Sequence, residues 1–250
     1  MAVVSIVFSP TGGTKKAVDM LSEAIPGEKI FIDLTDPDEN YASASIGTDD
    51  ISLIAMPVYG GRAPVLAMER FREIKGNGSR CLLLAVYGNR DFEDTLVEIQ
   101  DAAEECGFRV TGAIAAVAEH SVVHQYAAGR PDNQDREELH RAAENWLTAL
   151  ESNQGTPEIP GNRPYTKPMS LSLVPKPAKG CIGCGKCRNS CPAGAIDENF
   201  IADKRKCVSC MRCVTLWPVG ARKPGQLMVK LSAAVLKKDC SERKNIKVYF

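Results

Sequence analysis

With 250 residues, of which 44% are hydrophobic and 25% charged, the chain has an ordinary globular composition and room for one large domain or two smaller ones. No run approaches the roughly 18 apolar residues of a membrane span. The apolar opening at residues 2–8 lacks the basic leader and cleavage site of a secretion signal. We therefore expect a cytoplasmic protein without a membrane span, in which ten cysteines indicate metal binding rather than disulfides.

The formal net charge of zero hides an opposition between two parts of the chain. Residues 1–155 carry 13 Lys and Arg against 25 Asp and Glu, a difference of −12, whereas residues 156–250 carry 18 against 6, a difference of +12. Opposed charges favour either solubility or electrostatic docking, of the two parts on each other or on charged partners. Nucleic-acid binding is not expected, because the basic residues lack interleaved aromatics.

The first 150 residues alternate short apolar runs with helical patterns, which predicts a parallel sheet covered by helices on both faces. The predicted strands are residues 2–8, 29–34, 51–56, 81–86 and 109–116. The predicted helices are residues 15–24, 65–75, 92–106 and 139–150. Cys81 and Cys106 lie within these patterns and are interpreted as small buried residues.

The loop after the first predicted strand has the composition of a phosphate site. Hydroxyl groups, permissive glycine backbone and a helix N-terminus together surround a phosphate with donors. The residues concerned are Ser9, Thr11, Gly12, Gly13 and Thr14. Rival patterns fit poorly, because G-x-x-x-x-G-K-[ST] and G-x-G-x-x-G are both absent.

The loops after the third and fourth strands each offer one aromatic side chain to stack on a flat ring and glycines that let backbone approach it. They contain Pro57, Val58, Tyr59, Gly60 and Gly61, and then Tyr87, Gly88 and Asn89. In these three loops the chain resembles flavodoxin-like proteins, whose phosphate loop reads S-x-T-G-x-T and whose next two loops clasp the ring of FMN. The resemblance implies that all of these residues contact FMN. His120, after the fifth strand, reaches the same face and is interpreted as an ordinary loop histidine.

Residues 153–177 are rich in proline, which favours extended, semi-rigid chain and predicts a linker or a wrapping arm. Beyond it stand two copies of one cysteine frame, 26 positions apart. The first copy is Cys181, Cys184, Cys187 and Cys191, followed by proline. The second is Cys207, Cys210 and Cys213, with Trp217 at the fourth cysteine position, again followed by proline. The frame is an internal duplication.

The frame resembles the C-x2-C-x2-C-x3-C-P run of bacterial ferredoxins, in which the fourth cysteine of each run ligates the other of two [4Fe-4S] clusters. By that rule one intact site consists of Cys191, Cys207, Cys210 and Cys213. The second site has only Cys181, Cys184 and Cys187, because the indole nitrogen of Trp217 is a donor and cannot replace a thiolate. A zinc site is the competing interpretation, but it leaves the third cysteine of each triplet and the prolines unexplained.

The fourth ligand of the second site stays open at this point. Cys240 is the one spare thiol of the C-terminal part, 23 residues beyond the frame. A [3Fe-4S] cluster, a [4Fe-4S] cluster with one iron held by water or substrate, and the absence of this cluster are equally compatible with the spacing. An amphipathic pattern at residues 227–235, followed by basic residues, predicts a helical tail that packs on the protein.

As a whole, the chain resembles flavodoxin-ferredoxin fusion proteins of anaerobic bacteria and archaea. The resemblance implies an α/β fold: a flavodoxin-like, doubly wound parallel five-stranded sheet, followed by a small α+β bacterial ferredoxin-like domain. The expected boundaries are 1–152 for the FMN domain, 153–177 for the linker, 178–226 for the two-cluster domain and 227–250 for the basic amphipathic tail.

The expected function is intracellular electron transfer between [4Fe-4S] clusters, FMN and a redox partner, which is a protein or a small acceptor. Two further functions fit the same residues: an FMN-dependent reductase of NAD(P)H, quinone or another small acceptor, and a redox-responsive binding module. No acid, base or nucleophile is assigned a catalytic role, so the sequence leaves open whether the protein is an enzyme. It does not predict the oligomeric state.

Overall fold

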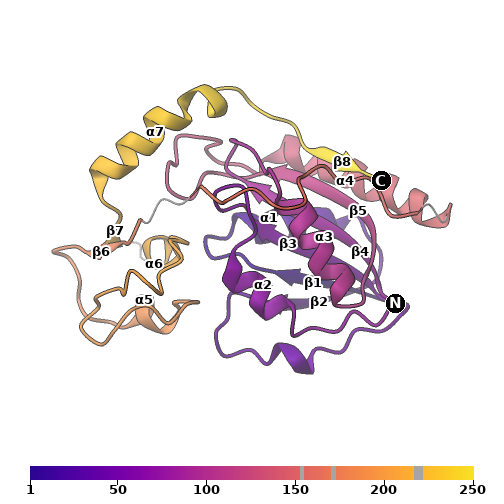
Figure 1. The fold of residues 1–250 in the computed structure, drawn as a ribbon, viewed down its shortest axis with the longest axis horizontal. Helices are drawn as coiled ribbons and strands as arrows, with labels where there is room; N and C mark the ends of the chain where they lie inside the picture. Colours follow the sequence, from indigo (N-terminus) through magenta and orange to yellow (C-terminus); the bar gives the residue numbers. More distant parts are fainter. Residues whose placement is uncertain (153–154, 170–172, 217–221) are drawn as a thin grey trace.

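The computed structural model describes residues 1–152, 155–169, 173–216 and 222–250. Its main sheet has the strand order β2-β1-β3-β4-β5-β8 (Figure 1). The parallel strands are β1 (Ala2–Val7), β2 (Glu28–Asp33), β3 (Ile51–Pro57), β4 (Arg80–Tyr87) and β5 (Arg109–Val117). The order reverses between β1 and β3, which is the point where doubly wound sheets bind ligands at their carboxyl ends. The predicted parallel five-stranded sheet is confirmed.

Helices cover both faces of the sheet, and strands β1, β3, β4 and β5 are therefore buried on both sides. Helices α1 (Gly13–Glu23) and α4 (Asn133–Glu151) pack on one face, around the fully buried Trp146. Helices α2 (Val65–Phe71) and α3 (Thr95–Glu105) pack on the other face. A short 3₁₀ turn, Tyr41–Ser43, follows β2. Cys81 and Cys106 are buried, as predicted.

The described part of the proline-rich segment is a wrapping arm. Ile159 joins the core beneath α3, and Met169 donates its backbone N–H to the oxygen of Gly60 at 2.9 Å. Burial opposes ionisation of Asp94, but four hydrogen bonds from Asn162 and Thr166 lower the pKa of this carboxyl to about 2. The arm is therefore anchored to the flavodoxin-like sheet by an ionised, buried carboxylate.

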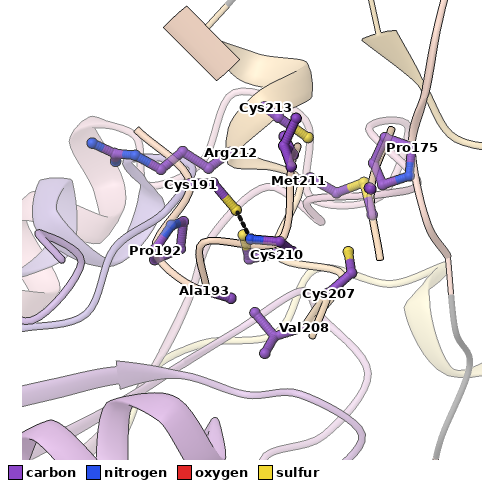
Figure 2. A pocket seen from close by; sticks show the side chains of 13 residues that line it. Pro175, Cys191, Pro192, Ala193, Cys207, Val208, Cys210, Met211, Arg212 and Cys213 are labelled. Atoms are coloured by element: carbon purple, nitrogen blue, oxygen red, sulfur yellow. Dashed lines mark hydrogen bonds between the residues drawn. The ribbon is translucent and has the colours of Figure 1, made fainter. Parts of the chain in front are cut away.

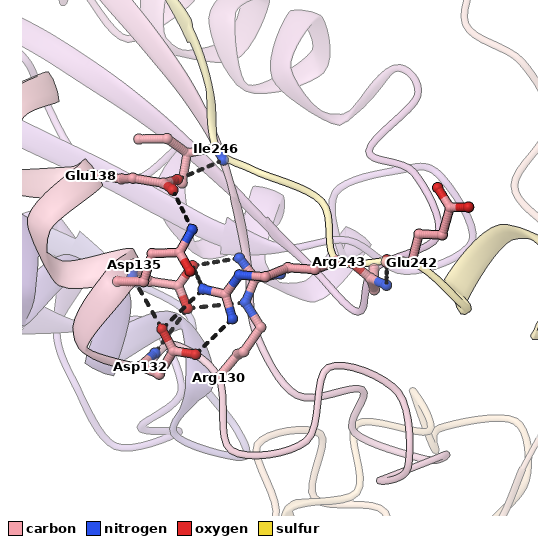
Figure 3. Close-up of polar contacts among 9 residues, drawn as sticks. Arg130, Asp132, Asp135, Glu138, Glu242, Arg243 and Ile246 are labelled. Carbon is pink, nitrogen blue, oxygen red and sulfur yellow. Dashed lines mark hydrogen bonds and ion pairs between the residues drawn. The ribbon is translucent and has the colours of Figure 1, made fainter.

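The C-terminal tail returns to the same sheet after helix α7 (Gln226–Cys240). Arg243 donates to both oxygens of Asp132 at 2.7 and 2.9 Å, next to the N-terminus of α4 (Figure 3). The last strand, β8 (Lys247–Tyr249), then pairs antiparallel with β5 as a sixth strand that the sequence pattern did not predict. Some of the opposite charges of the two parts form ion pairs within the protein, since Arg243 and Arg163 of the basic part pair with carboxylates of the acidic part.

The cysteine-rich part repeats its structure as it repeats its sequence. Helix α5 (Lys186–Asn189) and helix α6 (Arg212–Thr215) begin and end at equivalent positions of the two frames. Each follows a residue with left-handed backbone, Gly185 at φ 77° and Met211 at φ 62°. A two-stranded ribbon, β6 (Lys176–Pro177) with β7 (Arg222–Lys223), completes this part, which lies beyond the carboxyl ends of the main parallel strands (Figure 1).

Among the helices of the described residues, none is long and apolar enough to cross a membrane.

Candidate cofactor sites

A pocket lies at the carboxyl ends of β1, β3, β4 and β5, where the predicted FMN loops meet. Eight of the residues predicted to contact FMN line it: Thr11, Gly13, Thr14, Pro57, Val58, Tyr59, Tyr87 and Gly88. The loop after β5 adds Glu119, His120 and Ser121. The other five predicted residues, Ser9, Gly12, Gly60, Gly61 and Asn89, are not among its lining residues.

These five residues shape or tether the loops. Ser9 accepts the backbone N–H of Lys15 at 2.9 Å, which holds the first loop against α1. Gly60 and Gly61 have positive φ, and a Cβ at Gly60 would collide with the backbone of Met169 in the arm. Asn89 is buried and donates its amide to the carbonyl oxygens of Cys240 and Glu242 at 3.0 and 2.8 Å. The side chain of Asn89 therefore ties the C-terminal tail rather than facing the pocket.

The first loop fits a phosphate by its donors. Helix α1 starts at Gly13, and Ser9 receives the N–H of Lys15 in its first turn. The N–H groups of Gly13 and Thr14 have no hydrogen-bond partner among the described residues, so they are free to donate to a ligand. Gly12 has φ 90°, and no atom lies within 4 Å of the Cβ position there, which leaves space in front of the helix. Backbone donors, the macrodipole and the hydroxyls of Thr11 and Thr14 together suit the phosphate group of FMN.

The two tyrosines differ in what they can offer a flat ring. Tyr87 is only 3% exposed, and its ring packs in the core with its centroid 5.9 Å from that of Phe92. Tyr59 is only partly buried and lies in a tight turn, exchanging backbone hydrogen bonds with Arg62. Burial of the phenol group, and in second place the charge of Cys210, raise the pKa of Tyr59 well above its usual range. Tyr59 is the more exposed of the two tyrosines.

His120 has a local structural role. Its Nδ1 accepts the backbone N–H groups of Val122 and Val123, each at 3.2 Å, and its ring covers Gly88. Burial lowers the pKa of His120, so its neutral form prevails at pH 7. His120 is packed into its loop rather than projecting as an ordinary surface histidine.

Four cysteines surround one hollow of the cysteine-rich part, and they are the four predicted for the intact cluster (Figure 2). They are Cys191, Cys207, Cys210 and Cys213. Cys191 Sγ accepts the backbone N–H of Ala195 at 3.4 Å, and the backbone of Arg212 donates to Cys210. Such N–H···S bonds are among the features that set cluster potentials.

Burial raises the pKa of Cys210 to about 12, against the backbone hydrogen bond from Arg212. It raises the pKa of Cys213 to about 11, against the positive charge and the hydrogen bond of Arg222. Binding a metal supplies the positive charge that deprotonates such thiols. The donor set and the hollow therefore fit a cluster.

The remaining three frame cysteines line a second hollow. They are Cys181, Cys184 and Cys187, and they share this hollow with Phe200, Cys213 and Arg222. Cys181 and Cys184 are exposed, and Cys184 Sγ accepts the N–H of Lys186 at 3.5 Å, which matches the Arg212 contact of the first hollow. Trp217 lies outside the described residues. No three His, Cys, Asp or Glu side chains in the described ranges converge closely enough to bind a single metal ion.

Cys240 lines neither hollow. It is buried between α7 and the loop after β5, beside Val123 and Tyr126, and its thiol donates to the oxygen of Gly88 at 3.7 Å. Arg222, by contrast, lines the three-cysteine hollow although the sequence pattern did not single it out. The duplication contains the signal for it, because extending the repeat one position beyond Ala195 and Ala221 aligns Ile196 with Arg222.

The four-cysteine hollow is the one that adjoins the flavin-type pocket. Arg212 donates to the oxygen of Pro10 at 3.4 Å, and Arg70 donates to the oxygen of Pro192 at 2.6 Å. A further cavity has Tyr59 on one wall and Cys207 on another, with α7 along its side. Tyr59 consequently lies between the flavin-type pocket and the four-cysteine hollow.

Comparisons with known proteins agree with this division of the chain. Residues 178–197 match the family model described as 4Fe-4S binding domain. A segment of 42 residues is 52% identical to a subunit of the ion-translocating oxidoreductase complex of Methanosarcina acetivorans, and it spans 16% of this chain and 16% of that protein.

Solved flavodoxins are among the structural neighbours. A flavodoxin from the domain Archaea has a TM-score of 0.42 and 15% identity, over 60% of this chain and 99% of its own length. The flavodoxin of Streptococcus pneumonia has a TM-score of 0.41 and 17% identity, over 59% of this chain and 97% of its own. By its strand order and its matched 4Fe-4S domain, the chain joins a flavodoxin-like part to a ferredoxin-like part.

Proposed function

We propose that this protein transfers electrons between two iron-sulfur clusters, an FMN held at the sheet switch point, and a redox partner. Bound clusters exchange single electrons, and a flavin exchanges one or two. The observation that carries the proposal is the position of Tyr59, which lines the flavin-type pocket and also the neighbouring cavity that Cys207 of the four-cysteine hollow lines. A protein that only stored clusters would have no reason to place its cluster ligands against these loops.

The chain's own residues have distinct roles in this proposal. Thr11, Gly13 and Thr14 bind the FMN phosphate, and Tyr59 orients the ring. Arg70 and Arg212 fix the ferredoxin-like part against the sheet through the carbonyl oxygens of Pro192 and Pro10. The arm and α7 line the cavity between the two parts, to which they contribute Met169 and Met228.

The test is the cofactor content of protein purified without oxygen. We expect about one FMN per chain, iron and acid-labile sulfide for two clusters, and EPR signals of reduced clusters. Stoichiometric zinc without iron would contradict the proposal, and so would a protein that carries clusters but fails to bind added FMN.

An FMN-dependent reductase is the second candidate, and one observation favours it. The cavity beside Tyr59 shares Val58, His120 and Ser121 with the flavin-type pocket, and it presents apolar side chains together with Arg90 and Lys204. Such a cavity suits a flat acceptor with a negative group. Steady turnover of NAD(P)H or a quinone without any protein partner would favour the reductase over the carrier.

A further inference from the structure

The C-terminal tail holds a loop of the flavin-type pocket. Gly88 lines the pocket directly after β4, and its oxygen accepts the thiol of Cys240 at 3.7 Å. The next residue, Asn89, is 2% exposed and donates its amide to the oxygens of Cys240 and Glu242 at 3.0 and 2.8 Å. Lys244 donates to the backbone oxygen of the residue that follows. Three consecutive residues of the loop are therefore bonded to the tail.

The backbone of Asn89 needs this support. Its φ of 67° lies in the left-handed region, which asparagine adopts more readily than most residues but which still strains the chain. Such conformations persist where the surrounding contacts determine them. Here those contacts are the carbonyl oxygens of Cys240 and Glu242, which lie 151 and 153 positions away in the sequence. The conformation of the loop after β4 therefore depends on the tail.

Helix α7 holds the neighbouring loop, which follows β5, in a similar way. Tyr126 is buried, and its hydroxyl donates to the oxygen of Ala233 in α7. The backbone oxygen of Tyr126 accepts the N–H of His120 at 3.1 Å. The ring of His120 in turn covers Gly88, where an added Cβ would lie 2.7 Å from it. Gly88 is thus fixed by contacts with both His120 and the tail.

We propose that the tail is part of the flavin site, and that Asn89 is a positioning residue that holds the loop after β4 against the FMN ring without touching the ring itself. The tail comes directly from the cysteine-rich part, since Pro224 and Gly225 are the two residues that separate α7 from β7. One segment therefore connects that part of the chain to two loops of the pocket. This inference rests on the proposed function in requiring FMN in this pocket.

The test compares FMN with riboflavin, which has the same ring but no phosphate. Asn89→Ala in the full-length protein is expected to weaken the binding of both flavins by the same factor, at least about tenfold, because two buried hydrogen bonds to the tail are lost. Asn89→Gly keeps access to the left-handed backbone but lacks the amide, so it is expected to weaken both as well. Fluorescence titration measures the affinities. Visible circular dichroism of the bound flavin, which reports the surroundings of the ring, is expected to change in both variants.

Asn77→Ala is the matched control. Asn77 also has left-handed backbone, with φ 50°, and donates its amide to the oxygen of Ile46 at 3.0 Å, but it precedes β4 instead of following it. Asn77→Ala is expected to lower stability and to leave the affinity for both flavins unchanged. Lys244→Met alters the tail and not the loop, and is expected to weaken both flavins by a smaller factor. The exposed Lys237→Met is its control and is expected to change nothing.

The outcomes separate this inference from the proposed function. Equal flavin affinities in the wild type and in folded Asn89→Ala and Asn89→Gly overturn the inference, and so does a loss confined to FMN, because the ring is then not what Asn89 affects. If neither Asn89 variant folds, Lys244→Met decides: a loss shared by both flavins supports the inference, and unchanged affinities overturn it. In each of these results the wild type binds FMN and the proposed function stands. A wild type that fails to bind added FMN contradicts the proposed function itself.

Discussion

The two cysteine hollows come from one duplicated frame but lie in different surroundings. The four-cysteine hollow faces the flavin-type loops, and Arg70 and Arg212 connect its part of the chain to the sheet. In the three-cysteine hollow Cys181 and Cys184 are exposed. The duplication has therefore produced an inner site next to the flavin loops and an outer site open to solvent. In the proposed function, exchange with the flavin takes place at the inner site and exchange with a partner at the outer one.

Removing one ligand from each site is expected to have the largest effect. Cys210→Ala should abolish the inner cluster and with it the exchange between cluster and flavin, because Cys210 is the buried cysteine among the four that line the inner hollow. Cys184→Ala is the matched variant at the equivalent position of the outer site, and it should leave exchange between inner cluster and flavin intact. Stopped-flow flavin reduction and EPR measure both. Equal loss in the two variants would remove the distinction between inner and outer sites.

Restoring the missing cysteine of the second frame tests the prediction of two clusters. Trp217→Cys is expected to raise the iron and acid-labile sulfide content of protein purified without oxygen, because the two frames then contain eight cysteines, enough for two fully ligated [4Fe-4S] clusters. Trp217→Ala is the control and is expected to leave the content unchanged. Equal iron content in Trp217→Cys and the wild type would contradict the prediction that this position limits the second cluster.

Adding one methyl group at Gly12, in the loop after β1, is expected to weaken FMN binding. Gly12→Ala places a side chain at φ 90° in front of α1, which costs about 1–2 kcal/mol in strain and crowds the phosphate position. We expect FMN binding to weaken at least about tenfold, measured by flavin fluorescence titration. Gly78→Ala imposes similar strain at φ 81°, far from the pocket, and is expected to lower stability without changing FMN affinity. If both variants bind FMN equally well, Gly12 does not face the phosphate.

The arm that joins the two parts should loosen in acid. The pKa of Asp94 is about 2 in the folded protein against 3.8 for an ordinary aspartate, so its stabilisation is fully present above about pH 4 and is lost as the pH falls through 2. Asp94→Asn is expected to cost about 2 kcal/mol at pH 7 and to flatten the acid limb of the stability curve. Urea unfolding at several pH values measures this, with the exposed Asp38→Asn as control. An unchanged acid limb would show that the arm does not depend on this carboxylate.

The smallest expected effect concerns the tail. Arg243→Ala breaks an ion pair with Asp132, whose side chains are 36% and 42% exposed, and a 3.3 Å contact with the buried Asp135, which keeps Arg130 as its partner. We therefore expect a loss of only about 1 kcal/mol, part of which shrinks in salt. Thermal unfolding at low and high salt measures it. A large loss, independent of salt, would mean that the tail is part of the core.

The sequence predicted the parallel sheet because its strands are continuous apolar runs, a signal that does not depend on distant contacts. It did not predict β8, since Lys247–Tyr249 is short and lies in a tail that long-range contacts of Arg243 and Asn89 hold against the sheet. The sequence pattern also could not predict in which direction the side chains of Tyr87 and Asn89 point. Both lie in the expected loops, but one ring packs on Phe92 and one amide bonds the tail.

The cysteine frames could be recognised in the sequence because ligand spacing is local. In the structure Cys191, Cys207, Cys210 and Cys213 line one hollow, and Cys181, Cys184 and Cys187 line another, which Cys213 lines as well. The ligand sets of the two clusters remain predictions. The position of Cys240 could not be predicted from the sequence, because it depends on how α7 packs against the loop after β5. The position of Arg222 is an intermediate case. Its burial follows from carbonyl oxygens of Phe200 and Pro175 that only the fold brings near, although the repeat alone marks it as a departure.

The most direct test of the central claim, that the inner cluster adjoins the flavin, is a magnetic one. In partly reduced protein containing FMN and both clusters, the flavin radical is expected to relax much faster than in Cys210→Ala, because a paramagnetic inner cluster lies beside it. Cys184→Ala should keep the fast relaxation. Identical, slow relaxation of the flavin radical in wild type and Cys210→Ala, with all cofactors loaded in the wild type, would contradict the account.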